Sequence, residues 1–78
     1  MSNSAKEIEE VLATQDEEFR HWIQEHHQHE ERLALLAQKS TLSIDEELEE
    51  KHLKKRKLFL KDQMAARIRG YETRAAHA

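Results

Sequence analysis

The 78-residue sequence has no cysteine, no proline, a single glycine and four aromatic residues. Without cysteine, the chain can form neither a disulfide nor a cysteine-ligated zinc site, as is typical of a reducing compartment. A β-rich fold would need several turns, which usually use glycine, proline or asparagine, so the composition disfavours strands. The longest apolar run, residues 33–37, is much shorter than the roughly 20 residues of a membrane-spanning helix. We therefore expect an all-α protein in the cytoplasm, without a membrane partner.

Two helix-start signals divide the chain into two helices. Ser4 and Glu7 have the spacing of a capping box, in which each side chain bonds the backbone N–H of the other residue, and Ser43 and Glu46 repeat it. Between these boxes apolar residues recur every three or four positions, which predicts one helix over about residues 4–39. Gly70 is a typical C-cap residue, so we expect the second helix over about residues 43–70 and a flexible tail from about residue 71.

A short turn near residues 40–42 predicts that the two helices pack as an antiparallel hairpin. Residues whose numbers sum to about 83 should then face each other, which places Phe19 beside Met64 and Trp22 beside Leu60. The whole chain, residues 1–78, is predicted to form a single domain with a frayed N-terminus.

The second helix also has apolar residues on its opposite side. At about 100° per residue, four of them project away from the predicted contact with the first helix, and a fifth flanks them. They are Ile44, Leu48, Phe59 and Ala66, with Leu58 at their edge. Because exposed apolar faces usually mark interaction surfaces, we expect Leu48, Leu58 and Phe59 to bind a second copy of the chain or an unknown protein partner. Self-association would pair two hairpins into a four-helix assembly.

Charge is divided along the chain. Residues 1–50 carry 14 acidic and 4 basic side chains, a net of −10, whereas residues 51–78 carry 9 basic and 2 acidic ones, a net of +7. One interpretation of the basic stretch 51–61 is nucleic-acid binding. The total charge of −3 and the absence of interleaved aromatic residues favour another, in which the cations pair with the acidic first helix. The cations in question are Lys54, Lys55, Arg56, Lys57 and Lys61.

Three histidines stand close together in the first helix, at positions 26, 27 and 29. His26 and His29 are three residues apart and so share one side of a helix, as pairs of metal ligands often do. Two such ligands are too few, and no HExxH motif or complete set of Glu-x-x-His motifs is present. A metal-responsive role for His26 and His29 is therefore the less favoured interpretation, and ordinary positions between the helices, beside Lys57 and Lys54, are the favoured one.

Three segments carry a resemblance to a known family. They are Asp-Glu-Glu-Phe-Arg at 16–20, Glu-His-His at 25–27 and Leu-Lys-Lys-Arg-Lys-Leu-Phe-Leu-Lys-Asp-Gln-Met at 53–64. These segments resemble the YdcH-like family of short bacterial proteins of unknown function, over about residues 15–70. The resemblance implies an antiparallel helical hairpin and brings no known activity.

Catalytic groups are not apparent in the sequence. There is no cysteine nucleophile and no glycine-rich phosphate loop, and the serines lie at the N-terminus and in the predicted turn. We therefore expect no enzymatic activity and no cofactor. The favoured prediction is a small interaction module that self-associates, with nucleic-acid association through residues 51–61 and metal response through residues 26–29 as alternatives.

Overall fold

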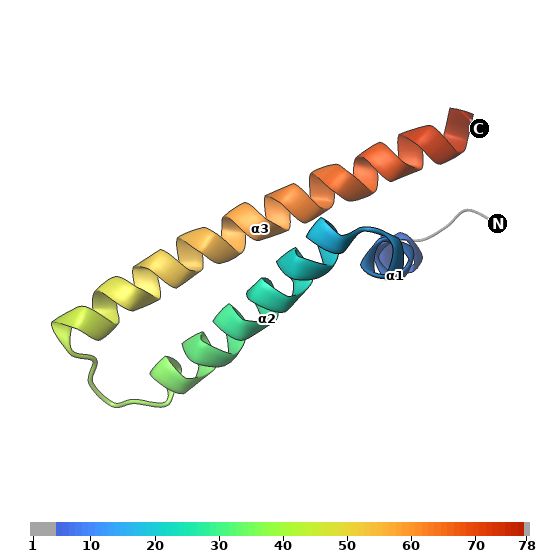
Figure 1. Ribbon diagram of the computed structural model, residues 1–78. Helices are drawn as coiled ribbons and strands as arrows, with labels where there is room; N and C mark the ends of the chain where they lie inside the picture. The colour runs from blue at the N-terminus through green and yellow to red at the C-terminus, as the bar shows by residue number, and fades with distance from the viewer. Residues whose placement is uncertain (1–4, 78) are drawn as a thin grey trace.

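The computed structural model describes residues 5–77, with the side chains of residues 5–74. This part of the chain consists of three helices, α1 (Ala5–Gln15), α2 (Glu17–Ala37) and α3 (Ile44–His77), shown in Figure 1. The all-α class is confirmed, but the prediction of two helices is wrong, because the expected first helix is divided. The capping box predicted at Ser4 lies outside the described residues.

The first helix is divided at Asp16, the single residue between α1 and α2. Its φ of −115° and ψ of 107° are extended, and its carboxylate accepts a hydrogen bond from the backbone N–H of Phe19 at 3.0 Å. Asp16 therefore caps α2, while its own N–H still donates to the carbonyl of Leu12 at 2.8 Å. The predicted helix over residues 4–39 ignored this cap, because the apolar spacing passes through Asp16 without interruption.

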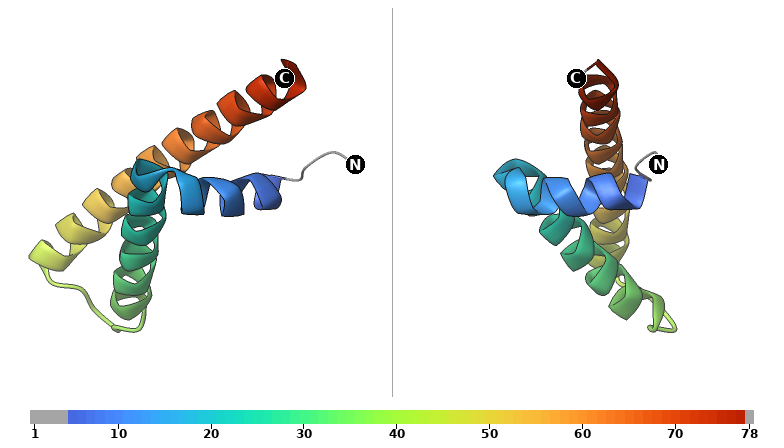
Figure 2. Two further views of the ribbon diagram at one scale, coloured as in Figure 1. Left: turned by 45° about the vertical axis from the view of Figure 1, so that its right-hand side comes forward. Right: turned by 90° about the vertical axis from the view of Figure 1, so that its right-hand side faces the viewer.

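At Asp16 the chain changes direction, so that α1 folds back over the end of the α2/α3 pair (Figure 2). The packing of α1 builds a core from all three helices at this end of the molecule. Ile8, Leu12 and Phe19 are buried there. Around them pack the partly buried Trp22, Ile23, Met64, Ile68 and Tyr71. A thinner contact continues toward the loop, where Leu36, Leu53 and Leu60 are buried.

The C-terminal end of α3 also differs from the prediction. The helix continues through Gly70 to His77, and no residue of the described chain has a positive φ, so Gly70 does not form the left-handed C-cap. A glycine inside a helix costs about 1 kcal/mol relative to alanine, which packing can offset. Here Tyr71 packs against the core formed with α1, and this contact stabilises the helix beyond Gly70, where a flexible tail was predicted.

Residues 38–43 connect α2 to α3, in agreement with the predicted turn. The capping box at the start of α3 is confirmed in both directions: the Ser43 N–H donates to Glu46 Oε1 at 2.9 Å, and the Glu46 N–H donates to Ser43 Oγ at 3.1 Å. Ion pairs between α2 and α3 join Arg32 to Glu49 and Glu25 to Arg56, and Asp16 joins Arg67. These residue numbers sum to 81, 81 and 83, which agrees with the predicted antiparallel register.

None of the helices described in residues 5–77 is both long enough and apolar enough to cross a membrane.

Candidate interaction surface

The outer face of α3, defined as Ile44, Leu48, Phe59 and Ala66 with Leu58 at its edge, is open to solvent. The exposed fractions are 77% for Ile44, 60% for Leu48, 61% for Leu58 and 47% for Phe59. The buried Leu53 and Leu60 lie on the opposite side of the same helix, because α1 and α2 both pack there. The exposure expected for Leu48, Leu58 and Phe59 is therefore present.

One exposed apolar side chain was missed. Leu35 in α2 is 54% exposed and lies beside the buried Leu36. The same helical projection that identified the outer face of α3 could have shown it, since Leu35 falls outside the apolar stripe of its own helix. No other large apolar side chain of α2 is exposed among the described residues, so Leu35 does not belong to a larger apolar face.

Half of the cations in the basic stretch form ion pairs within the described part of the chain. Arg56 donates from Nη2 to Glu25 Oε1 at 3.0 Å and lies over the Phe59 ring, 5.0 Å from its centroid. Lys57 lies 3.8 Å from Glu30, and Lys54 lies 3.7 Å from Glu50. The contacts of Arg56 and Lys57 agree with the interpretation that the cations pair with the acidic first helix, whereas Lys54 pairs with a carboxylate of its own helix.

The Arg56 contact has a large electrostatic effect on its partner. The Arg56 guanidinium, with a smaller contribution from His29, lowers the pKa of the Glu25 carboxyl from its ordinary 4.5 to about 2. In the folded chain Glu25 therefore stays charged down to about pH 2, and its ion pair with Arg56 joins α2 to α3.

Three cations of the stretch are exposed and form no ion pair in the described part of the chain: Lys51, Lys55 and Lys61. Lys55 and Lys61 are six residues apart, so they project about 120° from each other around α3 at about 100° per residue. The five cations expected at a nucleic-acid site are therefore divided between pairs inside the molecule and two separate sides of one helix.

The histidine cluster is paired with glutamates one helical turn away. His26 Nδ1 lies 3.1 Å from Glu30 Oε1, and His29 Nε2 lies 2.9 Å from Glu25 Oε2. Lysine neighbours were predicted for both histidines, and the closest charged contacts are carboxylates instead. Within residues 5–77, no group of three or more histidine, cysteine, aspartate or glutamate side chains is arranged to hold a metal ion.

His26 has one further property: its Nε2 atom is buried and has no hydrogen-bond partner. The ring lines an open hollow of about 450 Å³ between α2 and α3, together with the apolar Ile23, Met64 and Ile68. The imidazole thus uses one nitrogen to bind Glu30 and packs the other edge against apolar side chains. The seam position predicted for His26 agrees with this contact.

Arg67 joins α3 to the start of α2, a role that was not predicted from the sequence. It forms ion pairs with Asp16 and with Glu18, the latter at 2.7 Å, and its guanidinium stacks 4.7 Å from the centroid of the Trp22 ring. The Phe19 N–H and, next in size, Arg67 lower the pKa of the Asp16 carboxyl. Arg67 therefore ties the break between α1 and α2 to α3.

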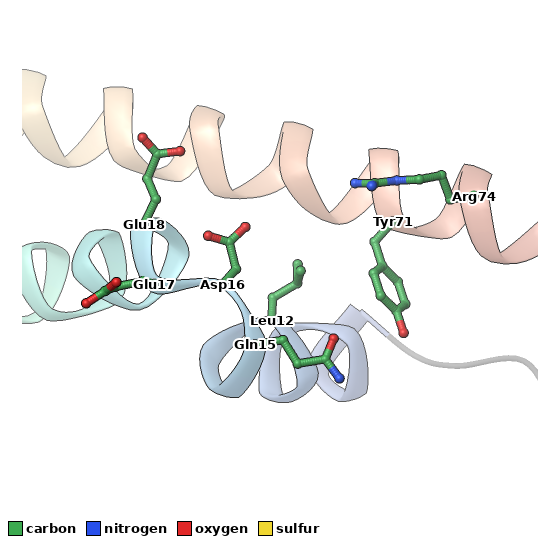
Figure 3. Close-up of a pocket in the computed structure, with 7 residues that line it drawn as sticks. All are labelled: Leu12, Gln15, Asp16, Glu17, Glu18, Tyr71 and Arg74. Carbon is green, nitrogen blue, oxygen red and sulfur yellow. The ribbon is translucent and has the colours of Figure 1, made fainter.

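A second hollow, of about 830 Å³, opens between this break and the C-terminal part of α3 (Figure 3). Leu12 and Gln15 line it from α1, and Tyr71 and Arg74 line it from α3. Its carboxylates are engaged, since Asp16 and Glu18 bind Arg67 and Glu17 lies 3.7 Å from Arg20. The hollow is a gap beside the α1 contact, lined by residues that hold the fold.

Comparison with known families gives one match. The model of the family described as "Protein of unknown function (DUF465)" matches residues 19–75. No curated protein and no solved structure shows a significant match. The matched segment contains nearly all of α2, the loop and most of α3, and it leaves α1 and Asp16 outside. Since the match covers most of the chain and the YdcH-like resemblance agrees with it, the chain belongs to the DUF465 family of proteins of unknown function.

Proposed function

We propose that the chain is a non-enzymatic protein–protein interaction module that self-associates through the outer face of α3. The observation that carries this proposal is the exposure of Leu48, Leu58 and Phe59, each about half exposed or more, on a helix whose other side holds the hairpin together. Apolar residues gathered on one helix face are typical of interaction surfaces. Two α2/α3 hairpins joined at this face would form a four-helix assembly, with each α1 at its side.

The small core of the chain supports the same proposal. Few apolar side chains are buried in the described residues: Ile8, Leu12, Phe19, Leu36, Leu53 and Leu60. Chains of this size bury only about 60% of the surface that their unfolded form exposes, so a partner that covers more apolar surface stabilises them.

The affinity expected from these apolar side chains is weak. Burying the exposed parts of Leu48, Leu58 and Phe59 contributes on the order of 1 kcal/mol each. Six such side chains in a symmetric pair contribute several kcal/mol, which is close to the lower end of the free energy lost when two molecules associate. We therefore expect only weak self-association from these side chains, at chain concentrations well above the micromolar range, since a dissociation constant of about 1 μM needs a net gain of about 8 kcal/mol.

Sedimentation equilibrium over a concentration series tests the proposal, with circular dichroism to confirm that each variant is folded. The wild-type chain is expected to form a dimer, and Phe59→Glu and Leu48→Glu are expected to be folded monomers. Leu35→Glu is the matched control, because Leu35 is exposed to a similar extent but lies on α2. A monomeric wild-type chain contradicts self-association, and dissociation by Leu35→Glu alone places the contact on another surface.

The two alternative functions have less support. Nucleic-acid binding would depend mainly on Lys51, Lys55 and Lys61, and Lys55 and Lys61 project about 120° apart around α3. Retention on DNA that decreases steeply with salt, and that Lys55→Ala removes, would favour it over self-association. A metal-responsive role would require His26 and His29 to leave the glutamates that they now contact.

A further inference from the structure

Gly70 has no explanation within a single copy of the chain. It lies inside α3, where glycine is less favourable than alanine. Its φ is not positive, and a Cβ atom placed on it meets no other atom within 4 Å. At about 100° per residue, Gly70 falls beside Ala66 on the outer face of α3. The C-terminal half of this face therefore carries small side chains, whereas the large side chain of Leu48 projects from the N-terminal half.

An antiparallel pair of α3 helices would place the bulky half of one copy against the low half of the other. If the two-fold axis passes beside Phe59, facing residues have numbers that sum to about 118, so Leu48 lies opposite Gly70 and His52 lies opposite Ala66. Phe59 lies close to the midpoint of α3 (Ile44–His77), so the two helices would overlap over almost their full length.

The charges on α3 favour the same register. Six charged side chains on the outer face or its flanks are exposed and form no ion pair in the described part of the chain. Under the antiparallel register they become three complementary pairs, each present twice: Lys55 with Asp62, Glu47 with Arg69, and Asp45 with Arg74. Lys51 also points outward and has no acidic counterpart.

A parallel pair would have the opposite effect. Lys55 would then face Lys55 and Asp62 would face Asp62, while the acidic residues 45 and 47 of both copies gather at one end and the basic residues 69 and 74 at the other, so that like charges meet at every level. Bulky Leu48 would face Leu48, and Gly70 would face Gly70, which leaves a gap at one end. Charge and side-chain size therefore both distinguish the two directions.

We propose that two copies of the chain pair through α3 in antiparallel orientation, with Phe59 beside the two-fold axis and Leu48 of each copy over Gly70 of the other. This inference rests on the proposed self-association and adds its direction, its register and its charged contacts.

Distances between spin labels on two copies test the direction. Because the chain has no cysteine, Lys51→Cys and Thr73→Cys each provide a single labelling site. With a rise of about 1.5 Å per residue, the antiparallel register predicts label separations of about 25 Å at position 51 and about 40 Å at position 73. A parallel pair predicts about 10 Å at both positions, which is the usual distance between packed helices.

The outcomes separate the two proposals. Long and unequal separations support the antiparallel register. Short and equal separations in a sample that sediments as a dimer contradict this register but leave self-association standing. A sample that sediments as a monomer and gives no dipolar signal contradicts both.

Exchanging charges tests the register independently. Lys55→Asp and Asp62→Lys are each expected to weaken dimerisation about tenfold or more, because each turns two attractive contacts into repulsive ones. The double variant Lys55→Asp/Asp62→Lys restores both contacts and is expected to recover the wild-type dissociation constant. Failure of the double variant to recover contradicts the register.

Substitution of Gly70 tests the fit of side chains. Gly70→Leu is expected to weaken dimerisation at least as much as the charge variants, while its helix content stays equal to that of the wild type, because a Cβ atom at this position meets open space in one copy. Dimerisation unchanged by Gly70→Leu contradicts the close approach of Leu48.

Discussion

Arg67 binds Asp16 at the residue where the chain breaks between α1 and α2. Asp16 has two roles at this point: it caps α2 through the Phe19 N–H at 3.0 Å, and it accepts the guanidinium that reaches across from α3. One carboxylate thus caps the start of α2 and joins it to α3.

Replacing Asp16 separates these two roles. Asp16→Ala removes both the cap and the ion pair and is expected to lower the free energy of unfolding by about 1–2 kcal/mol. Asp16→Asn keeps an oxygen that can accept from the Phe19 N–H and loses only the charge, so its effect should be clearly smaller. Urea denaturation measures both, and equal losses for the two variants would show that the ion pair, rather than the cap, carries the effect.

The Glu25–Arg56 pair predicts an acid sensitivity. Since folding lowers the pKa of Glu25 from 4.5 to about 2, the folded chain binds fewer protons than the unfolded chain in this interval. The contribution of Glu25 to stability is therefore complete above about pH 4.5 and is lost as the pH falls toward 2. Thermal denaturation between pH 6 and 2 is expected to show a falling melting temperature.

Glu25→Gln is the variant that isolates this effect. It should have a lower melting temperature than the wild type at pH 6 and a flatter dependence on pH below 4.5. Glu10→Gln removes an exposed carboxylate outside the α2/α3 contact and should retain most of the wild-type slope. The same slope in Glu25→Gln and in the wild type would assign the acid sensitivity to other groups, of which Glu46 beside Lys39 is the first to examine.

Gly70→Ala distinguishes the observed helix from the expected C-cap. In the middle of a helix with open space around its Cβ, alanine should raise the free energy of unfolding by up to about 1 kcal/mol. At a left-handed C-cap the same change would lower it. Denaturation at a chain concentration below dimerisation gives the sign, and a destabilised variant would mean that α3 ends near residue 70 in solution.

Zinc is expected to leave the melting temperature unchanged. A metal that binds the folded chain stabilises it in proportion to its affinity and concentration, and His26 and His29 are held by separate glutamates. A rise on adding zinc that disappears in His26→Ala would overturn this expectation. His21→Ala, which removes an exposed histidine from the same helix, is the control.

Local signals predicted much of this fold. The Ser43–Glu46 capping box located the start of α3, and the spacing of apolar residues identified Phe19, Leu36, Leu53 and Leu60 as inward-facing. These features depend on residues close together in the sequence or on a regular helical period. Both kinds of signal can be recognised in the amino-acid sequence alone.

The break at Asp16 shows where that approach fails. Leu12 and Phe19 have the spacing of one continuous apolar stripe, and both are buried. The spacing of apolar residues therefore cannot distinguish one straight helix from two helices that meet at a break. An aspartate followed by two glutamates was a visible helix-start signal, of the same kind as the acidic first turn at 45–47. The contact of Arg67 with Asp16 could have been predicted, because their numbers sum to 83 as in the antiparallel register, but the register does not show that α1 turns away at this residue.

Trp22 lies at the junction of the three helices, beside Phe19 and beneath Arg67, and it is the single tryptophan of the chain. Indole emission depends on the exposure of the ring to water. The intrinsic tryptophan fluorescence of this protein therefore reports on the contact between α1 and the α2/α3 pair. Helix content measured in the far ultraviolet reports mainly on the longer α2 and α3. Comparing the two signals during unfolding therefore shows, without any added dye, whether α1 lifts away while the α2/α3 pair is still intact.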